Sequence, residues 1–457
     1  MTRYAAPAFP KYSDVTDRHL QPGGVQGMAG HRTGRRAGYR GGHRAVPRTA
    51  TTIAGVAAVA LAIGVARFAL TPVAPLMLAS GALHGIGALA HMAMANYLGN
   101  LAGTVLCVTV IPRTAQLRAL QVGSVAIVLV TAAMAGSAAG PSWLLLRAAA
   151  GLAGAVVFVC GSSIVISGLD SRNASAGTAR LYRGIGGGIA LTALVVMLAT
   201  GWRSAWLYLA VLAAVLAVPA CRWIGQPAPS VGTRGPEQRL LRQRRPSVHA
   251  MIALCAAFFL EGLGYIVTGT FLPDLSGRAL SGGQVWLVAG LAAVPSCALW
   301  GKFVSRRGLA RVLPVAFAVQ AAGIALPALV PSAGAGLLSA VLFGGTFAAI
   351  VAMVFAWART LPGGPSPRAI GVLACCYGAG QVLGPLLASN GIHIALLLGA
   401  AAVACAIAPL LYVGWRTTQT RFRLIKNNDA VASVVFAQRD ELAVRAQRSA
   451  RRGAHAA

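Results

Sequence analysis

Three ionisable side chains lie deep inside long apolar stretches of this sequence: Arg67, Arg147 and Glu261. An ionisable group inside a membrane span costs about 2.5–3.5 kcal/mol on insertion scales, so its presence indicates a functional role by default. A guanidinium binds carboxylates through paired hydrogen bonds, and apolar surroundings favour the neutral form of a carboxyl group. We therefore expect Arg67 and Arg147 to attract an anionic or carboxylate-bearing solute. Glu261, the only acid in any apolar stretch, is the candidate for proton coupling.

The same side chains also have a purely structural interpretation. Arg67 could form a salt bridge with Glu261, and Arg147 could extend to lipid phosphates at the membrane surface. Glu261 would then stay ionised as a fixed counter-ion and would not titrate in the working range. Because the apolar stretches contain two of these cations and only one anion, at least one guanidinium lacks a fixed carboxylate in either case. The sequence leaves both interpretations open.

Further polar and aromatic side chains in the apolar stretches could line the same cavity by hydrogen bonding or stacking. For each of them, a hydrogen bond between neighbouring helices is at least as good an interpretation. His91 is a reserve proton site because histidine titrates near neutrality, whereas His84 falls in or beside a loop. The cavity candidates are Asn96, Tyr97, Tyr265, Tyr377 and Gln381.

Motifs of enzymes and metal sites are absent from the sequence. It contains no H-E-x-x-H, no G-x-x-x-x-G-K-[ST] and no G-x-S-x-G. The 8 cysteines all lie in or at the end of apolar runs, without C-x-x-C or mixed Cys and His spacing. We therefore expect no enzyme activity, no cofactor and no metal site.

Composition predicts that lipid surrounds most of this chain. Hydrophobic residues make up 57% of the sequence and charged residues 11%, whereas soluble domains carry about 25% charged residues. Apolar runs long enough to cross about 30 Å of hydrocarbon recur along the chain, and they are too continuous for barrel strands, so we expect helices. The twelve predicted spans are 52–78, 87–110, 119–137, 142–168, 184–200, 204–221, 249–272, 284–301, 312–330, 335–357, 369–388 and 392–413.

The positive charges are placed in a pattern that predicts membrane topology. A net charge of +30 would suggest nucleic-acid binding in a soluble protein. Here, Arg203 and Arg278 are the only cations in every second connection, and the tails and remaining connections hold all others outside the spans. Because cytoplasmic loops retain Lys and Arg, both termini should be cytoplasmic. We expect no nucleic-acid partner.

A polar, basic connection at 222–248 divides the spans six and six. It predicts a basic N-terminal tail (1–51), two six-helix bundles (52–221 and 249–413) joined by a cytoplasmic linker, and a basic C-terminal tail (414–457).

The two halves also echo one another. Gly64 and Pro75 of the first span recur as Gly262 and Pro273 of the seventh, both 198 positions later. Halves related by a repeat, with a site between them at mid-membrane, are typical of secondary transporters.

Several stretches between about 52 and 413 carry a family resemblance. They are ARFALTPVAPLM (66–77), ANYLGNLAG (95–103), RAAAG (147–151), RGIGGGIAL (183–191), FLEGLGYIVTGTFLP (259–273), LFGGTFAAI (342–350) and YGAGQVLGPLLAS (377–389). Together they resemble the YbfB/YjiJ-type family of the major facilitator superfamily. The resemblance implies two six-helix bundles, alternating access and ion-coupled uptake or export of a small solute, without naming that solute. Arg67, Arg147, Glu261 and Gln381 fall in the matching stretches.

The resemblance further implies that the second, fifth and eleventh spans meet at the interface between the halves. Each of these spans carries G-x-x-x-G spacing, which allows close helix approach, and the glycines are expected at that interface. The chain departs from the superfamily after its eighth span, where an Asp usually follows the glycine but Ser305 stands here. The glycine pairs are Gly99 and Gly103, Gly184 and Gly188, and Gly380 and Gly384.

As a whole, the sequence predicts an all-α polytopic membrane protein with the major facilitator fold. We expect a monomer in the bacterial plasma (inner) membrane that moves a small solute, with an anion as the favoured class, by proton-coupled alternating access. Its expected partners are the solute, protons and the lipid bilayer. The alternative from another class is a non-transporting polytopic sensor or scaffold protein, which would bind a partner without solute flux.

Overall fold

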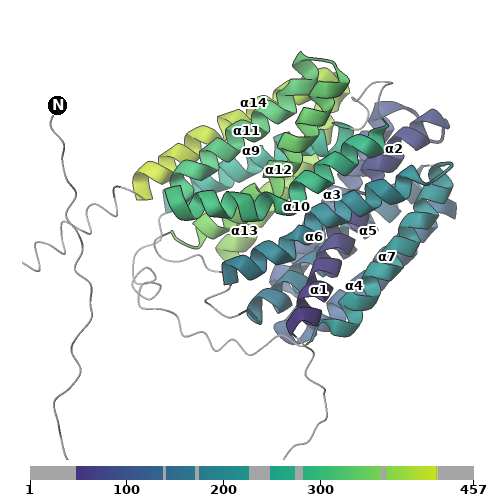
Figure 1. Ribbon diagram of the computed structural model, residues 1–457, viewed down its shortest axis with the longest axis horizontal. Helices are drawn as coiled ribbons and strands as arrows, with labels where there is room; N and C mark the ends of the chain where they lie inside the picture. The colour runs from purple at the N-terminus through teal and green to yellow at the C-terminus, as the bar shows by residue number, and fades with distance from the viewer. Residues whose placement is uncertain are drawn as a thin grey trace, which may run out of the picture. The chain divides into compact units, whose positions relative to one another are not determined.

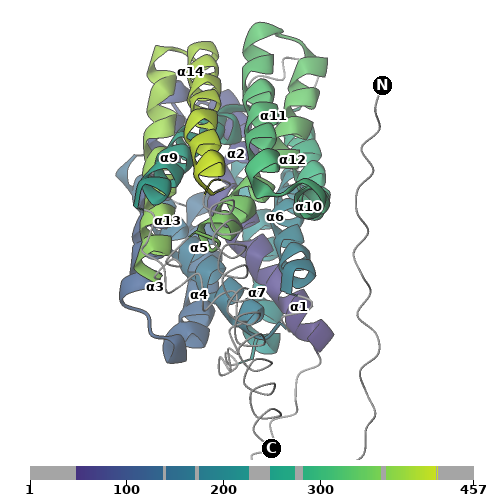
Figure 2. The same ribbon diagram turned by 90° about the vertical axis from the view of Figure 1, so that its left-hand side faces the viewer.

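The structure of the chain is a computed structural model. It describes residues 48–136, 140–169, 174–225, 248–272, 281–361, 367–417 and 419. The described residues are almost entirely helical, and they include no strand. In Figure 1 the helices of the first half (purple to teal) lie beside those of the second half (green to yellow), and Figure 2 gives the perpendicular view.

The first half of the chain contributes six spans. The first of these consists of three consecutive segments, α1 (Arg48–Val59), the π-helical η1 (Ala60–Arg67) and α2 (Leu70–Ala79). The others are α3 (Gly85–Thr109), α4 (Gln116–Gly136), α5 (Pro141–Ser167), α6 (Ala174–Met197) and α7 (Trp202–Trp223), with a short 3-10 helix η2 (Arg113–Ala115) before α4.

The second half contributes the remaining spans. They are α9 (Val248–Phe271), α10 (Gly282–Arg307), α11 (Leu309–Leu329), α12 (Ala333–Ala358), α13 (Pro367–Leu383), continued by the 3-10 helix η4 (Gly384–Asn390), and α14 (Ile392–Cys405).

These helices confirm the predicted all-α polytopic fold. Eleven helical segments of the described part are long and apolar enough to cross a membrane. The one predicted span not among these eleven, 87–110, corresponds to α3. Its middle carries Asn96 and Asn100 and is therefore less apolar. The predicted tails and the linker lie mostly outside the described residues, so the predicted domain division stays a prediction.

Large apolar side chains on the outward faces of the helices fit a lipid environment. Val122, Leu145 and Leu198 are 70%, 72% and 77% exposed. Exposed apolar area on this scale would promote association in water, whereas lipid tails solvate it.

The first span is irregular next to its arginine. The Phe68 amide donates to the Ile63 carbonyl over 3.1 Å, the i to i−5 bond of a π-helix, and α2 begins only at Leu70. π-helical turns occur frequently at functional sites. Arg67, the last residue of η1, therefore sits at a break in the span.

The G-x-x-x-G glycines pack inside each half, and not between the halves as expected. A Cβ on Gly99 would collide with the Ala148 carbonyl of α5, and one on Gly184 would collide with the Val56 carbonyl of α1. In the second half, a Cβ on Gly380 would collide with the Phe259 carbonyl of α9. The small residues thus bring backbones together within a bundle.

Between the halves, α6 packs against α10 and α3 packs against α13. Gly186 of α6 lies against Gly290 and Val294 of α10, with no room for a side chain. Figure 1 shows α6 and α10 side by side. Several candidate site residues, among them Arg67 and Tyr97, make hydrogen bonds from one half to the other.

Candidate functional site

Arg67 joins the two halves at the centre of the molecule. It is 9% exposed, and its Nη2 donates a 2.8 Å hydrogen bond to the Tyr265 hydroxyl of α9. Its Nη1 lies 3.4 Å from the Asn100 Oδ1 of α3, while its Cζ lies 5.4 Å from the ring centroid of Phe68 and 5.5 Å from that of Tyr97. The guanidinium is therefore held by neutral hydrogen-bond acceptors and aromatic rings.

Tyr265 receives a second hydrogen bond at the same oxygen. The Gln381 Nε2 of α13 donates to the Tyr265 hydroxyl over 2.9 Å. The Tyr265 ring stacks almost parallel on Tyr377, at a centroid distance of 5.6 Å and an angle of 5°. Three of the predicted cavity residues therefore meet around one hydroxyl group beside Arg67.

Glu261 lies one helical turn before Tyr265 on α9, so the two side chains share a face of the helix. It is fully buried, and its Oε1 accepts a 3.1 Å hydrogen bond from the Gln320 Nε2 of α11. Tyr377 lies close enough to interact with the carboxyl group. Glu261 and Arg67 form no salt bridge, although each lies within the electrostatic influence of the other. The bridged arrangement considered from the sequence is not the one adopted.

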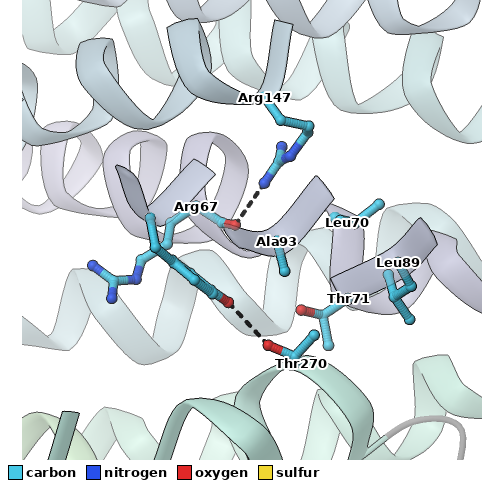
Figure 3. Close-up of a pocket in the computed structure, with 8 residues that line it drawn as sticks. Arg67, Leu70, Thr71, Leu89, Ala93, Arg147 and Thr270 are labelled. Atoms are coloured by element: carbon cyan, nitrogen blue, oxygen red, sulfur yellow. Dashed lines mark hydrogen bonds between the residues drawn. The ribbon is translucent and has the colours of Figure 1, made fainter. Parts of the chain in front are cut away.

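Arg147 points into the protein and does not reach the membrane surface. It is 2% exposed, and its Nη2 donates to the backbone carbonyl of Arg67 over 2.9 Å. Its Cζ lies 5.9 Å from the ring centroid of Trp206. Figure 3 shows this guanidinium directed at the Arg67 carbonyl. Arg147 thus stabilises the irregular end of η1 by donating to the backbone carbonyl of its last residue, Arg67.

Asn96 and Tyr97, adjacent on α3, have different surroundings. The Asn96 Nδ2 donates to the carbonyls of Ala66 and Arg147 over 3.0 and 2.9 Å, which ties three spans of the first half together. The Tyr97 hydroxyl lies 3.1 Å from the Thr270 hydroxyl of α9, in the other half. Asn96 therefore holds helices of the first half together by hydrogen bonds, whereas Tyr97 contributes to the contact between the halves.

A small pocket opens beside these residues, between η1, α2, α3, α5 and α9. Its lining combines charged and polar side chains with apolar ones. In Figure 3 the Arg67 guanidinium extends away from Leu70 and Leu89, so its backbone faces this pocket. The lining residues are Arg67, Leu70, Thr71, Leu89, Ala93, Tyr97, Arg147 and Thr270.

Sequence reasoning missed four polar side chains of the site, Asn100, Thr71, Thr270 and Gln320. Each is an amide or hydroxyl inside an apolar span, which is the signal that could have identified it. Asn100 also follows Asn96 by four positions on α3, the spacing of one helix face.

The histidines lie elsewhere. His84 and His91 are both exposed, away from the central network, so neither is placed to share a proton with Glu261. Within the described ranges, no group of three or more His, Cys, Asp or Glu side chains could hold a metal ion.

The all-helical fold, with its apolar outer face and its buried polar residues, is that of a polytopic integral membrane protein. The sequence matches the family described as "Uncharacterised MFS-type transporter YbfB" over residues 59–412. The chain belongs to this family of transporters of the major facilitator superfamily, which are not enzymes. No curated protein matches the sequence.

Proposed function

We propose that this chain is a secondary active transporter for a small anionic solute, coupled to protons through Glu261. The observation that carries the proposal is the Arg67 guanidinium, buried between the two halves without a carboxylate partner. A solute carboxylate bound there would complete the charge balance of the site.

The charge inventory favours an anion. Glu261 is the only Asp or Glu among the described residues, while Arg67 and Arg147 are both buried. An unpaired buried charge is strongly destabilising unless a counter-charge or a polar cavity compensates for it. The Nε atoms of both arginines also lack hydrogen-bond partners within the described protein. An incoming carboxylate can accept from such donors, which gives the solute its specificity.

The hydrogen bonds between the halves favour a site that can open and close as the halves move. Three side-chain hydrogen bonds cross from the first span and α3 to α9: Arg67 to Tyr265, Thr71 to the Gly269 carbonyl, and Tyr97 with Thr270. The two bonds between neutral groups contribute only about 1 kcal/mol each net, and the bond that the Arg67 guanidinium donates contributes about 1.5–3 kcal/mol. Such bonds can be broken and remade as the halves rock around the solute, which is the expected course of alternating access.

The position of Glu261 favours proton coupling. Its carboxyl group interacts with Arg67 and with Tyr377, and Tyr377 stacks on Tyr265, the hydrogen-bond partner of Arg67. An anion on Arg67 would change the field at Glu261, and a charge on Glu261 would change the attraction for the anion. Solute and proton would therefore influence each other's binding, as coupling requires.

We further propose that the protein resides in the bacterial plasma (inner) membrane as a monomer with both termini cytoplasmic. The distribution of Lys and Arg supports this orientation.

Solute uptake into proteoliposomes tests the proposed function. A panel of small organic anions, cations and neutral solutes is compared for wild type, Arg67→Ala and Arg118→Ala, the last an exposed arginine as matched control. We expect uptake of an anion that falls at least tenfold in Arg67→Ala and persists in Arg118→Ala. Uptake confined to cations or neutral solutes, or full anion uptake by Arg67→Ala, would contradict the proposal.

A further inference from the structure

In one hydrogen-bonded pair of buried side chains, each group keeps an oxygen atom that lacks a hydrogen-bond partner. Glu261 on α9 and Gln320 on α11 are both fully buried and are joined by one hydrogen bond, 3.1 Å from the Gln320 Nε2 to the Glu261 Oε1. The other oxygen of each group, Glu261 Oε2 and Gln320 Oε1, accepts no hydrogen bond from the described protein. Most buried polar groups are hydrogen-bonded, so two such atoms in one contact indicate a missing donor.

The chemistry of the two groups points to a donor that satisfies both oxygens, whereas the nearby Tyr377 hydroxyl carries a single hydrogen and could satisfy only one. An ionised carboxylate and an amide oxygen are both acceptors only, so neither can satisfy the other. A protonated carboxyl group carries one O–H donor. With the proton on Glu261 Oε2, that O–H can donate to Gln320 Oε1 while Gln320 Nε2 donates to Glu261 Oε1. The pair then forms two complementary hydrogen bonds and leaves neither oxygen unused.

We propose that Glu261 and Gln320 form a carboxylic acid–carboxamide pair that is the proton-binding site of this transporter, with Gln320 as its positioning residue. This inference rests on the proposed function in assigning coupling to Glu261, and adds the partner that holds the proton. Binding forms the Oε2–H bond on Glu261, with the proton taken from water. Release returns the proton to water and leaves a carboxylate that accepts from Gln320 Nε2 alone.

Release of the proton changes what Glu261 can bind. The deprotonated Oε2 and the Gln320 Oε1 are then both acceptors, so neither can satisfy the other. The titratable side chains that interact with Glu261 are Arg67 of η1, Tyr377 of α13 and Tyr265 of its own helix. The carboxylate would then turn toward Arg67, where it competes with the solute anion. Gln320 thereby favours the state in which Glu261 is protonated and Arg67 is free for the solute.

Infrared spectroscopy of the purified, solute-free protein tests this pair without any transport measurement. The carbonyl stretch of a protonated carboxyl group is compared at pH 7 for wild type, Glu261→Gln and Gln320→Met. Gln121→Met is the matched control, because Gln121 also donates from a span, to the Cys221 carbonyl over 3.2 Å. The spectra are recorded with sodium and with potassium as the only cation.

We expect a carboxyl band in wild type and in Gln121→Met that is lost in Glu261→Gln. In Gln320→Met the band should move to higher frequency, because the carbonyl loses its N–H donor. Glu261→Gln should also melt within about 2 °C of wild type, since its new amide can donate to Gln320 and so replaces the bond that the proton would make.

Three results would overturn the pair: no protonated carboxyl band assignable to Glu261, a band unaltered in Gln320→Met, or a band that sodium abolishes. If Gln320→Met fails to fold, the comparison of wild type with Glu261→Gln still decides whether the proton is present. A protein without solute flux that keeps the band would contradict the proposed function and leave the pair intact.

Discussion

Arg67 donates a 2.8 Å hydrogen bond to Tyr265, a residue 198 positions further along the chain. The Thr71 hydroxyl donates to the Gly269 carbonyl over 2.9 Å, and these two residues are also 198 positions apart. This separation is also the displacement that relates the glycine and proline of the first span to those of the seventh. Both bonds therefore link equivalent positions of the repeat, where the halves meet face to face. The candidate site residues Arg67 and Tyr265 lie at this contact, and a site between repeated halves is typical of secondary transporters.

Replacing Tyr265 by Phe should weaken solute binding while leaving the fold intact. The change removes the oxygen that accepts from Arg67 and Gln381 but keeps the ring stacked on Tyr377. A hydrogen bond to a charged group contributes about 1.5–3 kcal/mol, so we expect at least a tenfold higher apparent dissociation constant. Concentration-dependent uptake measures the change. Tyr208→Phe, at an exposed tyrosine, is the control, and equal uptake by both variants would argue against a role for the hydroxyl.

Asn96 and Asn100 on α3 should respond differently to alanine. Asn96→Ala removes two bonds to the carbonyls of Ala66 and Arg147, so it should lower stability by about 2 kcal/mol and leave solute preference unchanged. Asn100→Ala removes an acceptor for Arg67 and should lower solute affinity with little effect on the melting temperature. Melting curves in detergent and uptake assays separate the two effects. Identical phenotypes for the two variants would contradict this division of roles.

Adjacent glycines of α6 provide a sharp test of the packing between halves. A methyl group on Gly186 would collide with Gly290 and Val294 of α10, whereas one on Gly187 would meet no atom within 4 Å. Overpacking of this kind costs about 1–3 kcal/mol, so Gly186→Ala should disfavour the packed arrangement of the halves and slow transport several-fold. Gly187→Ala should transport at the wild-type rate. Equal rates for the two variants would show that this contact does not limit the cycle.

The placement of Lys and Arg predicts that both termini are cytoplasmic. A reporter enzyme that is active only outside the cytoplasm, fused after residue 457, should therefore be inactive in cells. The same enzyme inserted beside Arg203, in a predicted external connection, should be active. An active C-terminal fusion would rule out a cytoplasmic C-terminus and with it this orientation.

Hydropathy predicted the spans well because apolar length is a local property. The predicted span 312–330 corresponds to α11 at Leu309–Leu329, for example. Hydropathy placed the start of the fifth span wrongly, because α6 begins at Ala174 and not near 184. Arg180 and Arg183 ended the apolar run there, yet both are exposed and the helix continues past the membrane core. The π-helical η1 was also missed, because its sequence is as uniformly apolar as that of an ordinary helix.

The site was predicted as a set of residues but not as a set of contacts. Arg67, Glu261 and Tyr265 do gather at the centre, because buried polar side chains avoid lipid and face one another. Which side chain meets which depends on helix rotation and on close glycine packing, and a single sequence specifies neither. For this reason Arg67 meets Tyr265 and Asn100 while Glu261 meets Gln320.

Proton movement driven by a solute gradient shows whether Glu261 couples solute transport to protons. Proteoliposomes containing a pH-sensitive dye receive a gradient of the anion identified by uptake, with no initial pH difference, for wild type and Glu261→Gln. We expect the solute gradient to change the internal pH in wild type, and we expect Glu261→Gln to move the solute by exchange without any pH change. Solute movement without a pH change in wild type, or an unimpaired pH change in Glu261→Gln, would contradict proton coupling through Glu261.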